Sequence, residues 1–374
     1  MNVTATIDTE KQILQDKIND KLSSAERNVK PVLDKIEYEN NNSHDFMAPL
    51  GNPNVMKFNS NGSLKLETVT SDGLQSFNLH EHAIGQAGEK LGIPTGYIKK
   101  LSRGSQWERD LASNILNEHS AYTDRKKVLV RAVGNEVRGI LSDQYRRLDT
   151  SKIYSAFFNE CNKHGAAAIS AHIDSTRTYC ETILPNVISI PTGKNGVVHM
   201  VFGLRISNSD FGDGALRLQS YSMQVVCLNG MTRDNMLRQV HLGRQLPDDL
   251  SLSENTYRLD TETQASLISD IVGNSFNPKS IAKQAKIIQL ASESDVDLHN
   301  EIKKLKGTSL FKSEIEDIEK VLISNKKSDG VQGDATLWKL SQAMTAVARD
   351  SESTRRQREI EEISGKLFDR LKLD

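Results

Sequence analysis

Two β-rich runs on either side of a short polar turn constrain the fold of this chain more than any other feature. The first run is VVHMVFGLRIS, from Val197, and the second is ALRLQSYSMQVVCLN, from Ala215. The segment between them, SNSDFGDG, consists of residues that favour turns. A connection this short permits only antiparallel pairing, so we expect a hairpin with its turn at Ser207–Gly214.

Shorter runs of the same type extend the expected sheet. Alternating apolar residues predict a strand over 64–69, and a Gly-Asn pair separates expected strands at 127–133 and 136–142. Two further strands, 166–173 and 177–184, meet at another short turn. Because these connections have hairpin length, we expect an α+β fold in which a central antiparallel sheet has helices inserted between its strands.

Helical spacing begins near the N-terminus. Apolar residues three and four positions apart predict an amphipathic helix over 5–39, which Pro31 interrupts so that a second short helix follows. Residues 40–54 are expected to form a linker or irregular loop. A helix capped by Asn78 and ending at Gly92 is expected next, followed by two more helices.

From about residue 259 the spacing is again helical. The expected helices lie at 261–272, 278–291, 296–306, 312–324, 335–350 and 353–371. We therefore expect three parts: an N-terminal helical arm and linker over 1–60, an α+β core domain over 61–250, and a helical C-terminal region over 251–374 that packs on the core.

The cysteines and the hydropathy pattern indicate the compartment. Cys161, Cys180 and Cys227 lie far apart, without the spacing of zinc ligands. Their odd number, without a secretory leader, predicts a reducing environment. No apolar run approaches the roughly eighteen residues of a membrane span. We expect a soluble, cytoplasmic protein that has no cofactor and no membrane partner.

Charge is distributed unevenly along the chain. Residues 94–245 contain 20 Lys and Arg against 13 Asp and Glu, an excess of seven positive charges, although the whole chain has a net charge of −1. A basic excess on the β-rich segment predicts a face that binds a polyanion. The alternative is surface charge without a common face.

The arginines of the middle region suggest where such an anion would bind. Arg205 and Arg217 flank the expected turn, so pairing across it would bring two guanidinium groups to one end of the sheet. The residues expected to contact phosphate are Lys126, Lys127, Arg131, Arg138, Arg146, Arg147, Arg205, Arg217, Arg233, Arg238 and Arg244. The residues expected to stack on bases are Tyr145 and Tyr221.

The segment around Tyr145 also has a structural interpretation. In that alternative, Tyr145 belongs to the core and Asp143 or Asp149 pairs with a neighbouring arginine. The C-terminal segment RDSESTRRQREIEE has two interpretations as well. Acidic residues alternate with its arginines, which favours a solvated helix face over a nucleic-acid contact.

The sequence contains no P-loop, dinucleotide-binding, zinc-protease or serine-hydrolase motif, so we expect a non-enzymatic protein. A metal loop made by Asn208, Asp210 and Asp213 is an alternative to an ordinary turn, and Asp143 would complete a metal-dependent nuclease. His172, His199 and His241 lie on separate elements and predict no metal site.

Three blocks of sequence together resemble a known family. They are KLGIPTGYIKKL, VRGILSDQYRRLD, and LRISNSDFGDGALRLQSYSMQVVCLNGM with the trailing RQVHLGR. In this order they resemble the phage/plasmid-like family catalogued as the domain of unknown function numbered 932. The similarity extends from about Phe77 to the C-terminal helices, including TLWKLSQAMTAVA. Its members belong to phages, prophages and plasmids, which implies an accessory protein of a mobile genetic element inside a bacterial host cell.

Phage annealing proteins are a loose functional analogy, without a shared motif. Together with the basic middle region, the resemblance leads us to expect a protein that binds nucleic acid, with single-stranded DNA favoured, in recombination or replication. A homo-oligomer formed through the helical regions is also expected. The alternative is a protein-binding module that antagonises a host defence or regulatory protein.

Overall fold

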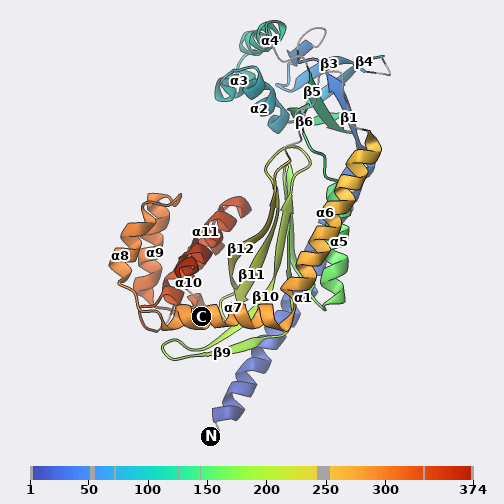
Figure 1. Ribbon diagram of the computed structural model, residues 1–374. Coiled ribbons are helices and arrows are strands. Elements are labelled where there is room, and N and C mark those ends of the chain that lie inside the picture. The colour runs from blue at the N-terminus through green and yellow to red at the C-terminus, as the bar shows by residue number, and fades with distance from the viewer. Residues whose placement is uncertain are drawn as a thin grey trace.

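The computed structural model describes residues 3–50, 55–70, 73–123, 127–143, 145–241, 253–331 and 333–371. Within these ranges the chain forms two six-stranded sheets and eleven α-helices (Figure 1). The predicted α+β class is therefore confirmed, but the strands form two sheets where one was expected. In the described part of the chain, no helix is both long and apolar enough to cross a membrane.

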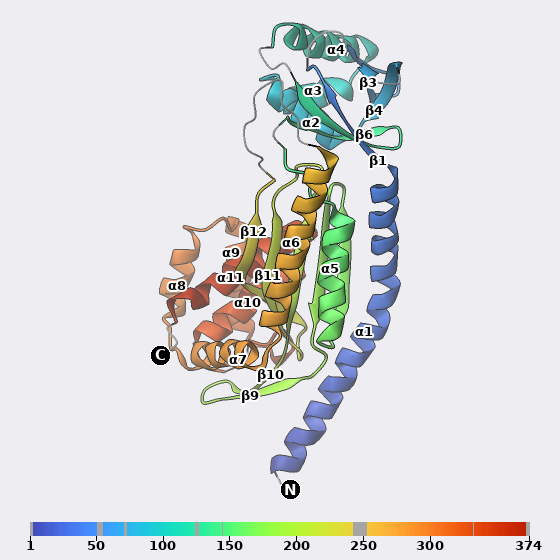
Figure 2. The same cartoon turned by 45° about the vertical axis from the view of Figure 1, so that its right-hand side comes forward.

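The chain begins with a long helix, α1 (Val3–Asn42), which packs on strand β7 of the second sheet. Leu14 and Ile18 are buried against this sheet, where they join a cluster that contains Val201. The expected break at Pro31 is wrong, because the helix continues through it. Figure 2 shows the helix changing direction along its length, and a proline inside a helix explains such a bend by removing one backbone hydrogen bond.

The first sheet and three helices form what we call the N-terminal unit, residues 43–142. Its strands pair in the order β1-β5-β6-β4-β3-β2, and only the β4–β6 pair is parallel. The strands are β1 (Ser43–Ala48), β2 (Val55–Phe58), β3 (Leu64–Thr70), β4 (Gly73–Leu79), β5 (Val128–Val133) and β6 (Glu136–Ser142). The expected linker over 40–54 is thus wrong at β1, and residues 51–54 lie outside the described ranges.

Three helices of the N-terminal unit contribute buried residues to its hydrophobic core. They are α2 (Glu81–Lys90), α3 (Thr95–Ser102) and α4 (Gln106–Ala121). Ile98 and Leu116 are fully buried, together with Leu64 on the sheet. The N-cap of α2 is His80 and not Asn78, because β4 continues to Leu79.

The second, or main, sheet has the strand order β12-β11-β10-β8-β7, with β9 pairing to β10. Its strands are β7 (Ala167–Asp174), β8 (Arg177–Ile183), β9 (Ile188–Thr192), β10 (Gly196–Asn208), β11 (Leu216–Gln224) and β12 (Asn229–Gln239). The expected hairpin is confirmed, since β10 and β11 pair antiparallel around the turn. The second run ends earlier than expected, because β11 stops at Gln224, residues 225–228 form a turn, and Asn229 already begins β12.

Helices cover both sides of the main sheet. Figure 1 shows α5 (Thr150–Lys163) and α6 (Glu254–Ser275) on one side and α10 (Leu337–Arg349) and α11 (Thr354–Lys366) on the other. The remaining C-terminal helices are α7 (Pro278–Glu293), α8 (Leu298–Leu305) and α9 (Lys312–Ser324). All six helices expected after residue 259 are present and pack on the main sheet or on one another.

The β10–β11 turn joins the main sheet to the N-terminal unit. Phe211, at its tip, is 4% exposed, and its backbone carbonyl accepts hydrogen bonds from His82 Nε2 (3.0 Å) and Gln86 Nε2 (2.9 Å). Gly212 follows with φ of +78°, and a Cβ there would collide with Leu141. The turn therefore packs between the main sheet and the N-terminal unit. We call this contact the junction.

Candidate functional site

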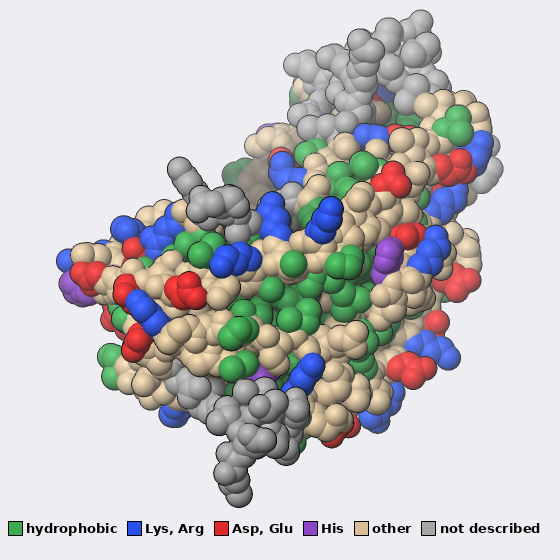
Figure 3. Space-filling model, turned by 60° about the horizontal axis from the view of Figure 1, so that its bottom comes forward, with side chains coloured by type: hydrophobic (Ala, Val, Ile, Leu, Met, Phe, Trp, Pro, Cys, Tyr) green, Lys and Arg blue, Asp and Glu red, His purple; other side chains and the backbone are tan. Residues whose placement is uncertain are grey.

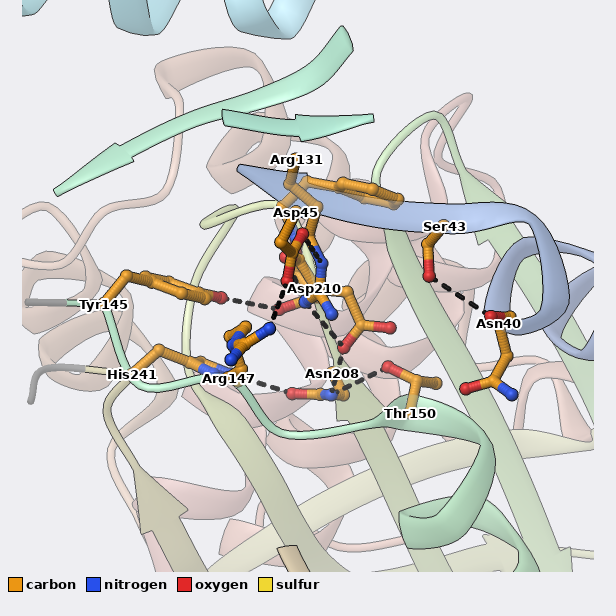
Figure 4. Close-up of polar contacts among 12 residues, drawn as sticks. Asn40, Ser43, Asp45, Arg131, Tyr145, Arg147, Thr150, Asn208, Asp210 and His241 are labelled. Atoms are coloured by element: carbon orange, nitrogen blue, oxygen red, sulfur yellow. Dashed lines mark hydrogen bonds and ion pairs between the residues drawn. The ribbon is translucent and has the colours of Figure 1, made fainter. Parts of the chain in front are cut away.

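Several of the arginines predicted to bind phosphate converge at the junction (Figure 4). Arg131 Nε lies 3.1 Å from Asp45 Oδ1, and Arg147 Nη1 lies 3.0 Å from Asp45 Oδ2. Arg131 also donates to the backbone carbonyl of Asp210, at 3.0 Å. These guanidinium groups therefore hold the N-terminal unit to the main sheet, and Arg131 is too deeply buried to meet a phosphate in this conformation.

Tyr145 and Arg146 lie at the same junction. Tyr145 is 7% exposed, stacks on His241 with ring centroids 5.2 Å apart, and donates to the Ser209 carbonyl at 3.1 Å. Burial raises its pKa above the ordinary value. Arg146 pairs with Asp260 of α6. Tyr145 thus belongs to the core, as the structural interpretation held, while Arg146 pairs with Asp260 and Arg147 pairs with Asp45.

A buried polar network continues from Tyr145 into the main sheet (Figure 4). His241 Nε2 lies 2.9 Å from Asn208 Oδ1, and the Asn208 amide donates to Thr150 Oγ1, also at 2.9 Å. Burial, with the charge of Arg131, lowers the pKa of His241 to about 4. Burial raises the pKa of Asp210 to about 6 against the opposing effect of the same arginine.

Arg205 lies inside the protein, 2% exposed, where its Nη2 contacts Glu181 at 2.8 Å and Glu361 at 2.6 Å. Burial opposes its charge, but these two carboxylates outweigh burial and raise the pKa of Arg205 above its ordinary value. Its guanidinium also lies 4.6 Å from the ring centroid of Tyr221, which is 4% exposed. Neither side chain is placed to meet a nucleic acid in this conformation.

The other predicted contacts are dispersed. Arg138 pairs with Glu39 and Glu136. Lys127 is exposed before β5, while Arg233 is half-buried and Arg238 exposed on β12. Lys126 and Arg244 lie outside the described residues. The predicted set therefore does not form one cationic face within the described ranges.

Arg217 is the predicted residue that lines a cavity, between one end of the main sheet and α11. The cavity has a volume of about 260 Å³. Its charged and aromatic lining residues are Arg177, Tyr179, Asp213, Arg217, Arg355, Arg358, Glu359 and Glu362. The expected solvated face of the C-terminal segment is therefore wrong at Arg358, whose side chain is only 11% exposed. We call this the arginine-lined cavity.

A second surface combines exposed aromatic and basic side chains. Trp107 is 66% exposed and Tyr97 is 48% exposed, while Lys100 and Arg103 are also exposed. Tyr97, Lys100 and Arg103 follow one another at three-residue steps, which places them along one side of α3 and its end. Trp107 lies four residues later, in the first turn of α4. We call these four residues the α3–α4 surface.

The α3–α4 surface differs from the hydrophobic surface in Figure 3. That view shows apolar side chains side by side at the end of the molecule where α7 and β9 lie, with basic side chains around them. On the α3–α4 surface, two basic residues lie between two aromatic residues within eleven positions, from Tyr97 to Trp107. Lys100 and Arg103 form no ion pair with a residue that the structure describes, whereas Lys99 pairs with Glu81 at 2.8 Å.

Sequence analysis did not single out the four residues of the α3–α4 surface, and among the arginines of the cavity it named Arg217 alone. The segment GYIKKLSRGSQW offered a signal, because basic residues lie there between two aromatic residues. No comparable signal marked the cavity residues Arg177, Arg355 and Arg358. Arg177 is 178 or more positions away from the other two, and they meet only through folding. The metal alternative gains no support, because the described residues contain no group of three His, Cys, Asp or Glu side chains able to hold an ion.

No family model, curated protein or solved structure matches this chain. The resemblance to the phage/plasmid-like family therefore stays a prediction that depends on the three sequence blocks.

Proposed function

We propose that this protein binds single-stranded nucleic acid without enzymatic activity, and that the α3–α4 surface is its contact. The observation that supports this proposal is the exposure of Trp107 (66%) and Tyr97 (48%) beside Lys100 and Arg103. Burying large aromatic side chains against a partner is favourable, and two of them exposed beside two cations form a surface suited to one. Every base has a π-face on which they can stack.

The two cations supply the other half of such a contact. Lys100 and Arg103 are exposed and have no ion-pair partner among the described residues, so each can meet a backbone phosphate without first breaking an ion pair. The arginines at the junction would have to break ion pairs with Asp45 or Asp260. Stacking combined with phosphate contacts favours single strands, because the bases of a duplex are covered by their neighbours. By the resemblance, this activity would serve recombination or replication of a mobile genetic element.

The test is fluorescence anisotropy of the full chain with a labelled oligonucleotide, single- or double-stranded, across a salt series. We expect Tyr97→Ala/Trp107→Ala to weaken single-strand binding about tenfold or more, since each stacked base contributes about 1–3 kcal/mol. Lys100→Gln/Arg103→Gln should also weaken binding and should make it less dependent on salt, by about one unit of slope per phosphate contact.

Matched controls exist elsewhere on the chain. Tyr38→Ala removes another exposed aromatic, 60% exposed on α1, and Lys303→Gln/Lys306→Gln removes two exposed cations near α8. Both controls should bind as the unmodified protein does. Equal affinity of all variants would refute the α3–α4 surface, and no binding at low salt would refute nucleic-acid binding altogether and favour the protein-binding alternative.

A further inference from the structure

The arginine-lined cavity contains guanidinium groups whose charge is only partly compensated. Arg177 is 7% exposed, and its nitrogens donate to Ser207 Oγ (2.8 Å) and to the carbonyls of Asp213 (2.6 Å) and Ala215 (2.7 Å). These acceptors are neutral, and no described carboxylate forms an ion pair with this arginine. Burial therefore disfavours the charged form without a paired carboxylate to oppose it, and it lowers the pKa of Arg177.

Arg358 is the second such group. Its Nη2 donates to Glu181 Oε1 at 2.8 Å, but the same oxygen also contacts Arg205 at 2.8 Å. Its Nε and Nη1 are buried and have no hydrogen-bond partner among the described residues. Glu181 thus contacts two buried guanidinium groups, of which Arg205 also pairs with Glu361. Burial lowers the pKa of Arg358 although the charge of Glu181 opposes the shift.

The more exposed arginines supply donors at the cavity mouth. The side chain of Arg217 is 36% exposed and lies 3.2 Å from Glu362, while Arg355 is 46% exposed and lies 2.6 Å from Asp213. Glu359 lines the cavity too, but it pairs with Arg356, outside the cavity lining, at 2.7 Å. The lining therefore holds four guanidinium groups and three carboxylates, and of these carboxylates Asp213 and Glu362 pair with cavity arginines.

We propose that the arginine-lined cavity binds a phosphate monoester. A buried charge without a counter-charge is unfavourable, so an anion entering the cavity would compensate Arg177. It would also accept from the buried Nε and Nη1 of Arg358, whose Nη2 shares Glu181 with Arg205. A phosphate monoester has a charge of about −1.5 to −2 and three acceptor oxygens, which match several guanidinium donors at once. The volume of about 260 Å³ is smaller than the roughly 300–1,000 Å³ of pockets for drug-sized ligands, so the phosphate group itself is the part recognised.

The phosphate has two sources, a free nucleotide or the 5′ end of a strand, and the experiment separates them. Thermal shift and calorimetry of the full chain would use inorganic phosphate, a nucleoside 5′-monophosphate, and one oligonucleotide with a 5′-phosphate or a 5′-hydroxyl. We expect inorganic phosphate and the nucleoside monophosphate to stabilise the protein. A buffer of equal ionic strength that contains neither phosphate nor sulfate should not stabilise it. Tighter binding of the 5′-phosphorylated strand would identify a strand end as the source, and equal binding of both strands would identify a free phosphate compound.

Two variants with opposite expected effects test the site. Arg217→Gln/Arg355→Gln should weaken phosphate binding at least about tenfold, because it removes two cationic hydrogen-bond donors at the cavity mouth. Glu362→Gln keeps a hydrogen-bonding group beside Arg217 but removes a competing negative charge, so it should strengthen binding about tenfold. A variant that merely unfolds cannot produce this gain.

The proposal is overturned if phosphate neither stabilises nor binds the protein, if both variants bind phosphate as the unmodified chain does, or if a dicarboxylate such as malonate binds more tightly than phosphate. Because the cavity is independent of the α3–α4 surface, a 5′-hydroxyl oligonucleotide separates the two proposals. Its binding without phosphate binding would refute the cavity proposal alone, and phosphate binding without strand binding would refute the proposed function alone.

Discussion

At the scale of single residues, the same arginines that suggested a ligand serve to hold the protein together. Arg131 and Arg205 are 5% and 2% exposed, and each lies against carboxylates from distant parts of the chain. Removing one partner of such a buried pair leaves an uncompensated charge, which typically costs about 3–5 kcal/mol. Loss of binding in an arginine variant is therefore informative only where the arginine is exposed, as Arg103 is.

His241 gives the prediction at this scale. Its ordinary pKa of 6.5 falls to about 4 in the folded protein, since burial and the charge of Arg131 outweigh the carbonyl of Arg146. As pH falls below 6.5, the unfolded chain binds this proton first, so the folded state loses stability until about pH 4. The loss approaches about 3 kcal/mol, at about 1.4 kcal/mol for each pKa unit.

Urea unfolding between pH 7 and 4.5 would measure this loss. The variant His241→Gln has no titrating group at this position, whereas both proteins keep Asp210, whose raised pKa adds stability as pH falls. The difference in free energy of unfolding between the unmodified protein and the variant should therefore fall as pH falls from 7 to 4.5. Identical pH profiles for the variant and the unmodified protein would show that His241 does not have the lowered pKa.

At the scale of elements, α1 is an integral part of the main sheet's packing and not a peripheral arm. Ile18 is fully buried in a cluster with Val201 and Met223 of the main sheet, whereas Ile13, on the same helix, is 63% exposed. A long helix with mainly polar residues gains most of its stability from such contacts.

We therefore expect Ile18→Ala to lower the free energy of unfolding of the whole protein by about 2–4 kcal/mol. Ile13→Ala is the matched control and should change it by less than about 0.5 kcal/mol. Chemical denaturation followed by circular dichroism measures both. An Ile18→Ala variant as stable as its control would show that α1 does not pack on the sheet.

At the scale of the whole molecule, the junction determines how the two sheets are held together. Phe211 is buried there, and Arg138 lies 5.3 Å from its ring centroid. Hydrogen bonds from His82 and Gln86 to the Phe211 carbonyl join the helices of the N-terminal unit to the same turn. The β10–β11 hairpin thus has a second role beyond pairing within its own sheet.

Phe211→Ala should uncouple the two parts. We expect a loss of about 3–5 kcal/mol at the junction and, in differential scanning calorimetry, an earlier transition for the N-terminal unit that separates from that of the main sheet. Phe311→Ala, a control at a residue 62% exposed, should melt as the unmodified protein does. If Phe211→Ala melts in one unshifted transition, the junction does not couple the parts.

The elements that could be predicted from the sequence are those marked by turn residues or apolar spacing within a few positions. The hairpin around Ser207–Gly214 and the helices after residue 259 follow from turn residues and apolar spacing, which depend on neighbours a few positions away. Strands β1 and β9 lacked such signals, because β1 pairs with β5 about 85 positions away and β9 is interrupted by Pro191. Pairing partners, and not local preference, decided those strands.

Whether a charged side chain is exposed or paired depends on contacts that form only in the folded chain. Whether Arg205 meets solvent or Glu361 depends on how α11 packs on the main sheet, a contact between residues 156 positions apart. The arginine-lined cavity arises in the same way from the main sheet and α11. The exposed aromatics next to Lys100 and Arg103 were visible in the sequence, but their exposure depends on which face of α3 the N-terminal unit buries, and that is a property of the folded chain.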